Sequence, residues 1–445
     1  MLNGRLSRRS LINLTGAAVA AGVLAEPVRA GAASTDEPVV AWLNRQAVPL
    51  PRLDAGGPVH DLRSLSTVVG TAQVVGLGES AHGTREQFTL KHRAVRFLVE
   101  CLGFRTLSWE ENWGSGVAID RYVVGGEGDP RELVAATSSL WRSEEMLDLV
   151  RWMREYNLSH EDKVRFLGTD LTQLRQLLFD EIVAYVRDIA PNRIDDLERD
   201  LDPIRLTGDA QRHVGWYLQQ PDKQPYIDHA RAVYDLVLGL PPGPSRIGRE
   251  YAVQHARTIL GFYEYYAVQL LDQRDRFMAD TLTWWQRRTR HRVVYWAANV
   301  HTAASPLVTY SLPPFVPPTQ AVVAGSHLRQ RYGRRYVSVG TMFHTGEVLT
   351  GWENGSPSVF QVPPPSGIMV DHVLGRAKHP DFVLDLHADA PLPVRRWLNQ
   401  PATMRLIGSA YNSGNDSAYA MSVESWISAF DAILHLDTTT PVRLL

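Results

Sequence analysis

The sequence predicts an α/β protein that has a three-layer core with a mostly parallel sheet, a helical insertion and a C-terminal α+β portion. Three observations support this fold class. An apolar strand pattern at residues 74–77 precedes a strongly periodic helix, helical periodicities dominate the middle of the chain, and a second buried-strand pattern follows at 292–296. Because polar segments follow both strands, we expect those segments at the same carboxyl edge of an open parallel sheet.

The first strand and helix are joined by a glycine-rich turn that holds an acid and a histidine, Glu79 and His82. The helix is expected to begin after Thr84, which forms a capping-box pattern with Gln87, and to end at Gly103. Its apolar residues recur every three or four positions and include Cys101 on the apolar side. The acid and the histidine therefore lie at the N-terminal mouth of this helix.

Glu79 and His82 are arranged as a general base requires. The partial positive charge of the helix N-terminus disfavours a charged imidazolium, and the glutamate can hold the ring in one tautomer. Two other interpretations stay open. Gly76-x-Gly78-x-x-Ala81 also fits the permissive dinucleotide-binding fingerprint, with Glu110 closing the strand pattern at 105–109. Alternatively, the acid and the histidine only satisfy backbone groups of the turn.

The chain is predicted to have three parts after its N-terminal segment. Residues 39–170 form the first part of the α/β core and end with a short strand at 164–170. Residues 171–288 form the helical insertion, which several prolines interrupt. Residues 289–445 form the second part of the core with the α+β C-terminal portion.

Residues 1–32 are predicted to be a signal peptide of the twin-arginine type. Arg8 and Arg9 precede an apolar run at 14–24, and Ala30-x-Ala32 offers a small-residue cleavage site. An ordinary charged region of the general secretory route is the alternative. No later stretch reaches 18 uninterrupted apolar residues, so we expect a secreted or extracytoplasmic protein without stable membrane insertion.

The composition is that of an ordinary globular protein. With 46 Lys+Arg against 48 Asp+Glu, the formal net charge is −2, which gives no electrostatic case for binding nucleic acid. The single cysteine excludes a disulfide framework. Twelve Trp and sixteen Tyr suffice both to pack a core and to line a large apolar pocket.

Motifs spread from about residue 39 to the C-terminus carry a resemblance to one known family. They are Gly78-Glu79-x-x-His82-Gly83-Thr84-x-Glu86-x-Phe88, Arg274-Asp275-x-x-Met278-Ala279, Trp296-Ala297-x-Asn299-x-His301 and Gly325-Ser326-His327-Leu328. In this order they resemble the erythromycin esterase family, which includes succinoglycan-biosynthesis-like proteins. The resemblance implies that the catalytic residues are Glu79, His82, Glu110 and His301. It also implies that Lys91, Arg93, Asn299 and Arg274 bind the substrate.

One position departs from the family pattern. Members with macrolide esterase activity read His-Asn-x-His in the second motif, whereas this chain reads Ala298-Asn299-Val300-His301. Alanine cannot donate, accept or titrate. The role of the absent histidine is therefore supplied by another group or is not needed for this protein's reaction.

Other hydrolase chemistries find little support. The chain has no Gly-x-Ser-x-Gly elbow, and Cys101 falls within a helix rather than at its N-terminus, which disfavours serine and cysteine nucleophiles. The His-Glu-x-x-His motif is absent. A dispersed metal site built from the four catalytic residues is an open alternative, but we expect no metal and no other cofactor, because their spacing requires none.

The sequence thus predicts a metal-independent hydrolase whose partner is a small molecule with an ester or a lactone, derived from a bulky secondary metabolite. His82, oriented by Glu79, would take a proton from water, Glu110 would position that water, and His301, Asn299 or a cation near Arg93 would stabilise the oxyanion. One alternative is a non-hydrolytic tailoring enzyme that catalyses elimination, cyclisation or transesterification. Another is an exported protein that binds a ligand without turnover.

Overall fold

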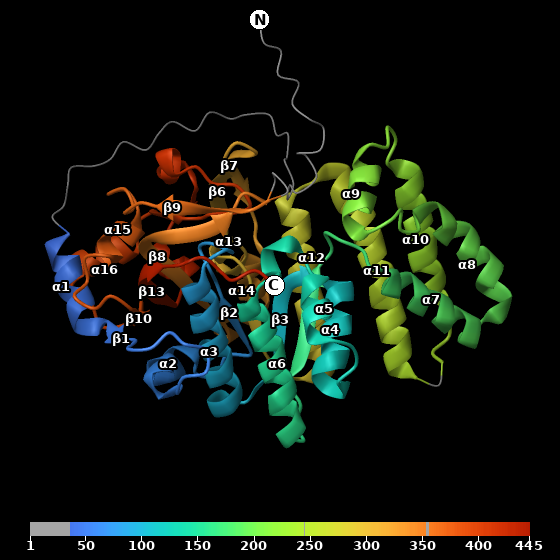
Figure 1. Cartoon of the computed structure of the whole chain (residues 1–445), viewed down its shortest axis with the longest axis horizontal. Coiled ribbons are helices and arrows are strands. Elements are labelled where there is room, and N and C mark those ends of the chain that lie inside the picture. Colours follow the sequence, from blue (N-terminus) through green and yellow to red (C-terminus); the bar gives the residue numbers. More distant parts are fainter. Residues whose placement is uncertain (1–35, 244, 353–355) are drawn as a thin grey trace, which may run out of the picture.

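The computed structural model describes residues 36–243, 245–352 and 356–445 (Figure 1). The predicted signal peptide, residues 1–32, lies outside the described residues, and so does its arginine pair. Among the helices of the described part, none is long and apolar enough to cross a membrane.

A central sheet of nine strands organises the described residues, and most neighbouring strands run parallel (Figure 1). The order is β1-β10-β13-β8-β2-β5-β3-β4, with β9 paired to β8. All pairings from β13 to β4 are parallel, whereas β1, β10 and β9 pair antiparallel. The bounds are Val48–Pro49 (β1), Val74–Leu77 (β2), Phe104–Asn112 (β3), Arg165–Asp170 (β4), Arg292–Trp296 (β5), Tyr336–Thr350 (β8), Ser358–Val362 (β9), Phe382–Asp385 (β10) and Ala432–Thr439 (β13).

A second sheet supplies the α+β character of the C-terminal portion. In the described residues it has four antiparallel strands in the order β11-β12-β6-β7. Their bounds are Val308–Leu312 (β6), Val316–Ala321 (β7), Ala402–Arg405 (β11) and Ala420–Val423 (β12). The mixed fold class that the sequence predicts is confirmed.

Helices cover both faces of the central sheet. Alternate side chains of a strand point to opposite faces. Val75 and Leu77 of β2 therefore join one apolar core with helices α3 and α6, and Val74 joins another with α12 and α14. The bounds of these four helices are Arg85–Leu102 (α3), Glu144–Ser159 (α6), Leu271–Thr289 (α12) and Ala324–Tyr332 (α14). The result is the three-layer core.

Between β4 and β5 the chain is helical. Helices α7 to α11 pack around their own apolar core on the right of Figure 1, and α12 then returns onto the sheet. Their bounds are Gln176–Ile189 (α7), Ile194–Leu201 (α8), Ala210–Leu218 (α9), Gln224–Gly239 (α10) and Arg246–Val268 (α11). The remaining α-helices are Glu37–Gln46 (α1), Ser64–Val69 (α2), Trp113–Gly125 (α4), Pro130–Ala135 (α5), Asn299–Thr302 (α13), Val370–Leu374 (α15), Leu392–Leu398 (α16) and Trp426–Ala429 (α17).

Helix α3 ends as predicted, at Gly103 in the left-handed region (φ 72°), but two details of the prediction are wrong. Thr84 precedes the helix without capping it through its side chain. Instead, Gln87 Nε2 donates to Thr84 Oγ1 (2.7 Å), and Gln87 Oε1 accepts from the backbone N–H of Ser80 (2.9 Å), which fixes the loop before the helix. Cys101 is exposed, as is the neighbouring Glu100, whereas Leu98 and Val99 of the preceding turn are buried.

Candidate active site

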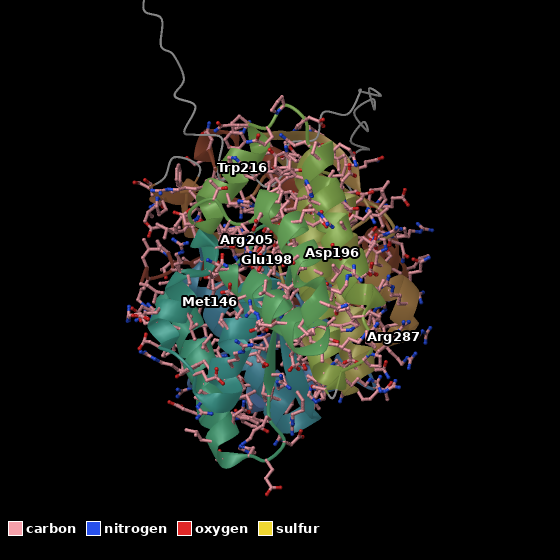
Figure 2. The ribbon with its side chains drawn as sticks, turned by 90° about the vertical axis from the view of Figure 1, so that its right-hand side faces the viewer. Met146, Asp196, Glu198, Arg205, Trp216 and Arg287 are labelled. Carbon is pink, nitrogen blue, oxygen red and sulfur yellow. The ribbon has the colours of Figure 1, made fainter. Side chains whose placement is uncertain are left out.

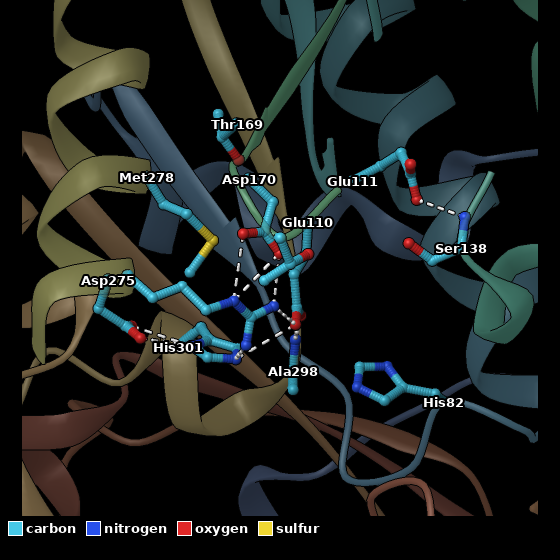
Figure 3. A network of polar contacts seen from close by, with 12 residues as sticks. His82, Glu110, Glu111, Ser138, Thr169, Asp170, Asp275, Met278, Ala298 and His301 are labelled. Carbon is cyan, nitrogen blue, oxygen red and sulfur yellow. Dashed lines mark hydrogen bonds and ion pairs between the residues drawn. The ribbon is translucent and has the colours of Figure 1, made fainter. Parts of the chain in front are cut away.

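The carboxyl ends of four adjacent parallel strands meet in one pocket (Figure 3). His82 comes from the loop between β2 and α3, Glu110 from β3, Asp170 from the end of β4, and His301 from α13, which follows β5. The order β2-β5-β3-β4 makes these strands neighbours. The fold therefore brings together the two motifs that the sequence placed at one edge.

The remaining walls of this pocket come from both sides of the molecule. On one side lie Val214 of α9 and Tyr265 and Tyr266 of α11. On the other lie Tyr310 of β6 and Val316 of β7, from the antiparallel sheet. The helical segment and the second sheet thus enclose a space with both apolar and polar walls, and the charged groups Glu110, Asp170 and Arg274 lie where it meets the central sheet.

His82 is held through one ring nitrogen. Its Nδ1 lies 2.9 Å from Glu79 Oε1, and the imidazole is 11% exposed. The other oxygen of Glu79 pairs with the ammonium of Lys91, and both side chains are fully buried. Burial lowers the pKa of Lys91 to about 8, although Glu79 and Glu110 oppose that shift. Since a glutamate flanked by a lysine accepts, His82 Nδ1 donates to it, which leaves the lone pair on Nε2.

The free edge of His82 points into the pocket. Figure 3 shows the ring directed toward Ala298 and the carboxylate network beyond it. No group of the described residues bonds to His82 Nε2. The indole of Trp141 packs edge-on against the imidazole, with 5.0 Å between the ring centroids, and Trp141 Nε1 donates to the backbone carbonyl of Glu110 (2.9 Å). The imidazole of His82 is thereby held by Glu79 on one side and by Trp141 on another.

Opposite His82 lies a buried network of ion pairs centred on Arg274 (Figure 3). Its guanidinium donates to Asp170 (2.6 Å at the shortest) and to Glu110 Oε1 (2.9 Å). His301 lies between two carboxylates, with Nδ1 2.9 Å from Asp275 and Nε2 3.2 Å from Glu110. Glu110 Oε2 also accepts from the backbone N–H of Ala298 (2.9 Å). Arg274 Nη1 also lies 3.4 Å from His301 Nε2, so an arginine and a histidine share three carboxylates in this network.

These contacts set the protonation states. Burial opposes a charge on His301, but Asp275 and Glu110 outweigh it and raise the pKa of His301 to about 10. Burial likewise opposes charge on Glu110, yet His301, His82 and Arg274 hold the pKa of that carboxyl well below its usual range. At neutral pH His301 is therefore an imidazolium, suited to stabilise negative charge or to donate a proton, and unsuited to accept one.

The raised pKa of His301 has a consequence for stability. A group whose pKa is higher in the folded state stabilises the fold fully below its unfolded pKa, and that contribution is lost as pH rises through the folded pKa. We expect the stability advantage of the wild type over His301→Gln to decline between about pH 6.5 and 10, by about 1.4 kcal/mol per pH unit. Urea unfolding of both proteins at several pH values measures this difference. An advantage that stays constant across this window would contradict the charged state of His301.

Two residues that the resemblance implies as substrate-binding lie away from the pocket. Arg93 is fully buried and donates to the backbone carbonyls of Arg52 and Pro58 and to Asp61, so it fastens α3 to the preceding segment. Asn299 donates to the backbone carbonyl of Thr341 (2.8 Å) and pins α13 to β8. Neither Arg93 nor Asn299 is therefore among the side chains that line the pocket, whereas His301, the third group expected to stabilise an oxyanion, is.

Lys91 and Arg274, the other two residues implied as substrate-binding, differ in their access to the pocket. Lys91 is buried beneath Glu79 and does not line the pocket, so its contact is with the acid that holds His82. Arg274 does line the pocket, where it joins Asp170 and Glu110. Of the four residues implied as substrate-binding, Arg274 is thus the one with access to a ligand.

Sequence reasoning did not single out Asp170, Asp275 or Trp141. Asp170 ends a predicted strand, so the rule that polar residues gather at carboxyl strand ends would have identified it. Asp275 follows Arg274 directly in the helix motif. Nothing in the sequence indicates that Trp141 contacts His82, because this contact joins a short 3-10 turn, Ser139–Trp141, to a loop almost 60 residues earlier.

The grouping of His, Cys, Asp and Glu side chains bears on whether the protein binds a metal. In residues 36–243, 245–352 and 356–445, no three His, Cys, Asp or Glu side chains are grouped as a metal site.

Comparison with known proteins identifies the family. The erythromycin esterase family model matches residues 99–439, which is most of the chain. The chain belongs to the erythromycin esterase family. An Escherichia coli relative, erythromycin esterase type II, is 31% identical over 130 residues, which cover 29% of this chain and 31% of that protein.

Two other similar proteins align with a larger share of this chain. YbfO of Bacillus subtilis (strain 168), a hydrolase by name, is 21% identical over 387 residues, covering 81% of this chain and 84% of that protein. A crystal structure of a Bacillus cereus protein has a TM-score of 0.82 at 26% identity, covering 93% of this chain and 100% of that one. Family membership and these names indicate a hydrolase, and the solved structure shares the fold.

Proposed function

We propose that this family member hydrolyses an ester or a lactone of a bulky secondary metabolite, with His82 as general base. The observation that carries the proposal is the orientation of His82. Its Nδ1 is held by Glu79, and its Nε2 is unbonded and faces the pocket opposite the cations of Arg274 and His301. A histidine held in this way accepts a proton from water at neutral pH.

The reaction would proceed in two proton transfers. His82 Nε2 removes a proton from a water that Glu110 helps to position, and the hydroxide attacks the substrate carbonyl. The charge that develops on the carbonyl oxygen faces His301 and Arg274, which are already ordered by carboxylates and need no reorganisation. The tetrahedral intermediate then collapses, and protonated His82 returns its proton to the leaving alkoxide. No covalent enzyme intermediate forms, and the water supplies the oxygen of the new carboxylate.

The test is a panel of macrolactones and simpler bulky esters, incubated with the protein in ¹⁸O-labelled water. We expect a lactone to give one product heavier by one water and an ester to give an acid and an alcohol, in each case with a single ¹⁸O in the new carboxylate. Products of the same mass as the substrate, or products that join substrate to an added alcohol, would instead support the non-hydrolytic reaction. Ligand retention without any product would support a binding protein.

Ala298 gives a second test of the pocket. Its backbone N–H donates to Glu110, and its methyl group faces the pocket beside His82 (Figure 3). If the missing histidine matters for macrolide cleavage, the wild type should be poor on 14-membered macrolactones. Ala298→His should then raise kcat by about tenfold, below the 10²–10⁴ of a fully supported acid or base.

Val300→His is the matched control for this substitution, because Val300 also lines the pocket but does not adjoin Glu110. We expect no gain from it. Efficient macrolactone cleavage by the wild type, with no increase in Ala298→His, would show that His82 and His301 suffice.

We propose in addition that the protein is exported through the twin-arginine route, on the basis of Arg8 and Arg9 and the apolar run that follows them.

A further inference from the structure

Two basic segments that are distant in the sequence meet on the surface of the structure. One ends helix α12 and includes Arg287 and Arg290; the other includes Arg331 of α14 and Arg334 and Arg335 of the 3-10 turn that follows, η6 (Gly333–Arg335). All five arginines are exposed, and we call them the arginine face. Figure 2 shows Arg287 toward the right-hand edge of the molecule.

The sheet explains why these segments are adjacent. Strands β5 and β8 begin directly after them and pair with the two sides of β2, so that Val74 is the partner of both Val293 and Tyr336. The backbone of Gln73 links the two segments: its carbonyl accepts from the N–H of Val293, and its N–H donates to the carbonyl of Arg335. The face therefore lies at the amino edge of the sheet, opposite the edge that bears the pocket.

Contacts between α12 and α14 confirm that the guanidiniums share one environment. Arg331 donates to Thr283 Oγ1 of α12 (3.0 Å). Burial raises the pKa of the Tyr332 phenol, and Thr283 opposes that rise together with the charges of Arg287, Arg331 and Arg335. Three arginines from two segments thus act on one phenol.

Positive charge on this face is largely uncompensated. Within the described residues, Asp280 is the one carboxylate that pairs with any of the five arginines, and it contacts Arg331. The whole chain has a formal net charge of −2, so this excess is a local asymmetry. It creates a field that attracts anions of high charge density.

The side chains around the arginine face indicate which class of anion it would bind. Trp285, Tyr332 and Tyr336 are buried, so none of these three rings is open for a base to stack on. The exposed large hydrophobic residues of the described chain lie elsewhere, so nothing on this face would insert into a bilayer. What remains is a cluster of guanidiniums, which bind phosphate through paired N–H groups.

We propose that the arginine face holds the protein on anionic phospholipid bilayers through headgroup phosphates, without insertion. Adsorption by this face leaves the pocket at the other edge of the sheet open to solvent. A membrane outside the cytoplasm is also the surface that the expected export would bring within reach. The inference concerns a site separate from the pocket and does not rest on the proposed hydrolysis.

The experiment compares binding of the full chain to vesicles of phosphatidylcholine alone and to vesicles with 30% phosphatidylglycerol. Sedimentation should recover the protein with the anionic vesicles only, and 0.5 M salt should release it. One basic residue near such a surface is worth about fivefold in affinity, so Arg287→Gln/Arg335→Gln should bind about 10 to 30 times more weakly.

The matched control is Arg395→Gln/Arg396→Gln, which removes two exposed arginines of α16 that pair with no carboxylate of the described residues; α16 lies on the left of Figure 1. This control should bind like the wild type. The wild type and the two double variants all contain residues 1–35. A difference in vesicle binding between them therefore reports the substituted arginines alone. Equal binding by both double variants would overturn the proposal. So would binding of double-stranded DNA or polyphosphate that depends on Arg287 and Arg335 while vesicle binding does not.

Discussion

His82→Ala is expected to lower kcat by about 10²–10⁴ while leaving the fold intact. The loss is large because no other histidine that lines the described pocket has an unbonded ring nitrogen. The other pocket histidine, His301, is charged at neutral pH and bonded on both nitrogens. The fold should survive because His82 makes a single side-chain hydrogen bond, and Glu79 keeps its pairing with Lys91.

The measurements are initial rates on the best substrate of the panel, together with circular dichroism and thermal melting. His229→Ala is the matched control, because His229 pairs with Asp200 at 3.0 Å in the helical segment, away from the pocket. It should retain full activity. A melting temperature lowered far more in His82→Ala than in the control would assign His82 a structural role, and an active His82→Ala protein would remove it from the mechanism.

Arg274→Met is expected to lower the free energy of unfolding by about 3–5 kcal/mol and to abolish activity. Burial opposes the charge of Arg274, but Asp170 and Glu110 raise its pKa well above the usual range, so it is always a cation. Its removal leaves two buried carboxylates, Asp170 and Glu110, beside the imidazolium of His301. Urea unfolding of the wild type and the variant measures the cost.

A double-mutant cycle separates the contribution of the Arg274–Asp170 ion pair to the free energy of unfolding from the contribution of the packing of the Arg274 side chain. If most of the cost comes from an uncompensated buried charge, Arg274→Met/Asp170→Asn should be more stable than Arg274→Met alone. Arg443→Met is the control, since Arg443 is half exposed in its pair with Glu145 and should cost at most about 1 kcal/mol. Additive effects of Arg274→Met and Asp170→Asn would show that the ion pair is not what stabilises this edge.

Much of the site follows from simple rules of sheet topology. His82 and His301 each follow an apolar strand, and the carboxyl ends of adjacent parallel strands share one edge, so their proximity was predictable without a structure. The helix periodicity also predicts α3 and its end at Gly103. The pairing of Glu79 with His82 follows from a three-residue spacing in a tight turn.

Other features depend on contacts that spacing does not reveal. Lys91 and Arg93 are two positions apart on α3, and such residues point in different directions. Lys91 therefore reaches Glu79 while Arg93 reaches Asp61, and neither side chain lines the pocket, although both were expected to bind the substrate. The pairing of Arg274 with Asp170 joins residues 104 positions apart and depends on how α12 returns across the sheet after the helical segment.

The most direct measurement is the tautomeric state of His82, because hydrolysis by a general base requires a free lone pair on the nitrogen that faces the pocket. Long-range ¹H–¹⁵N spectra of ¹⁵N-histidine-labelled protein at neutral pH, assigned by comparison with His82→Ala, report the two ring nitrogens separately. We expect a protonated Nδ1, bonded to Glu79, and an unprotonated Nε2. A proton on Nε2 instead, or on both nitrogens, would mean that His82 cannot accept a proton from water, and would contradict its role as the base.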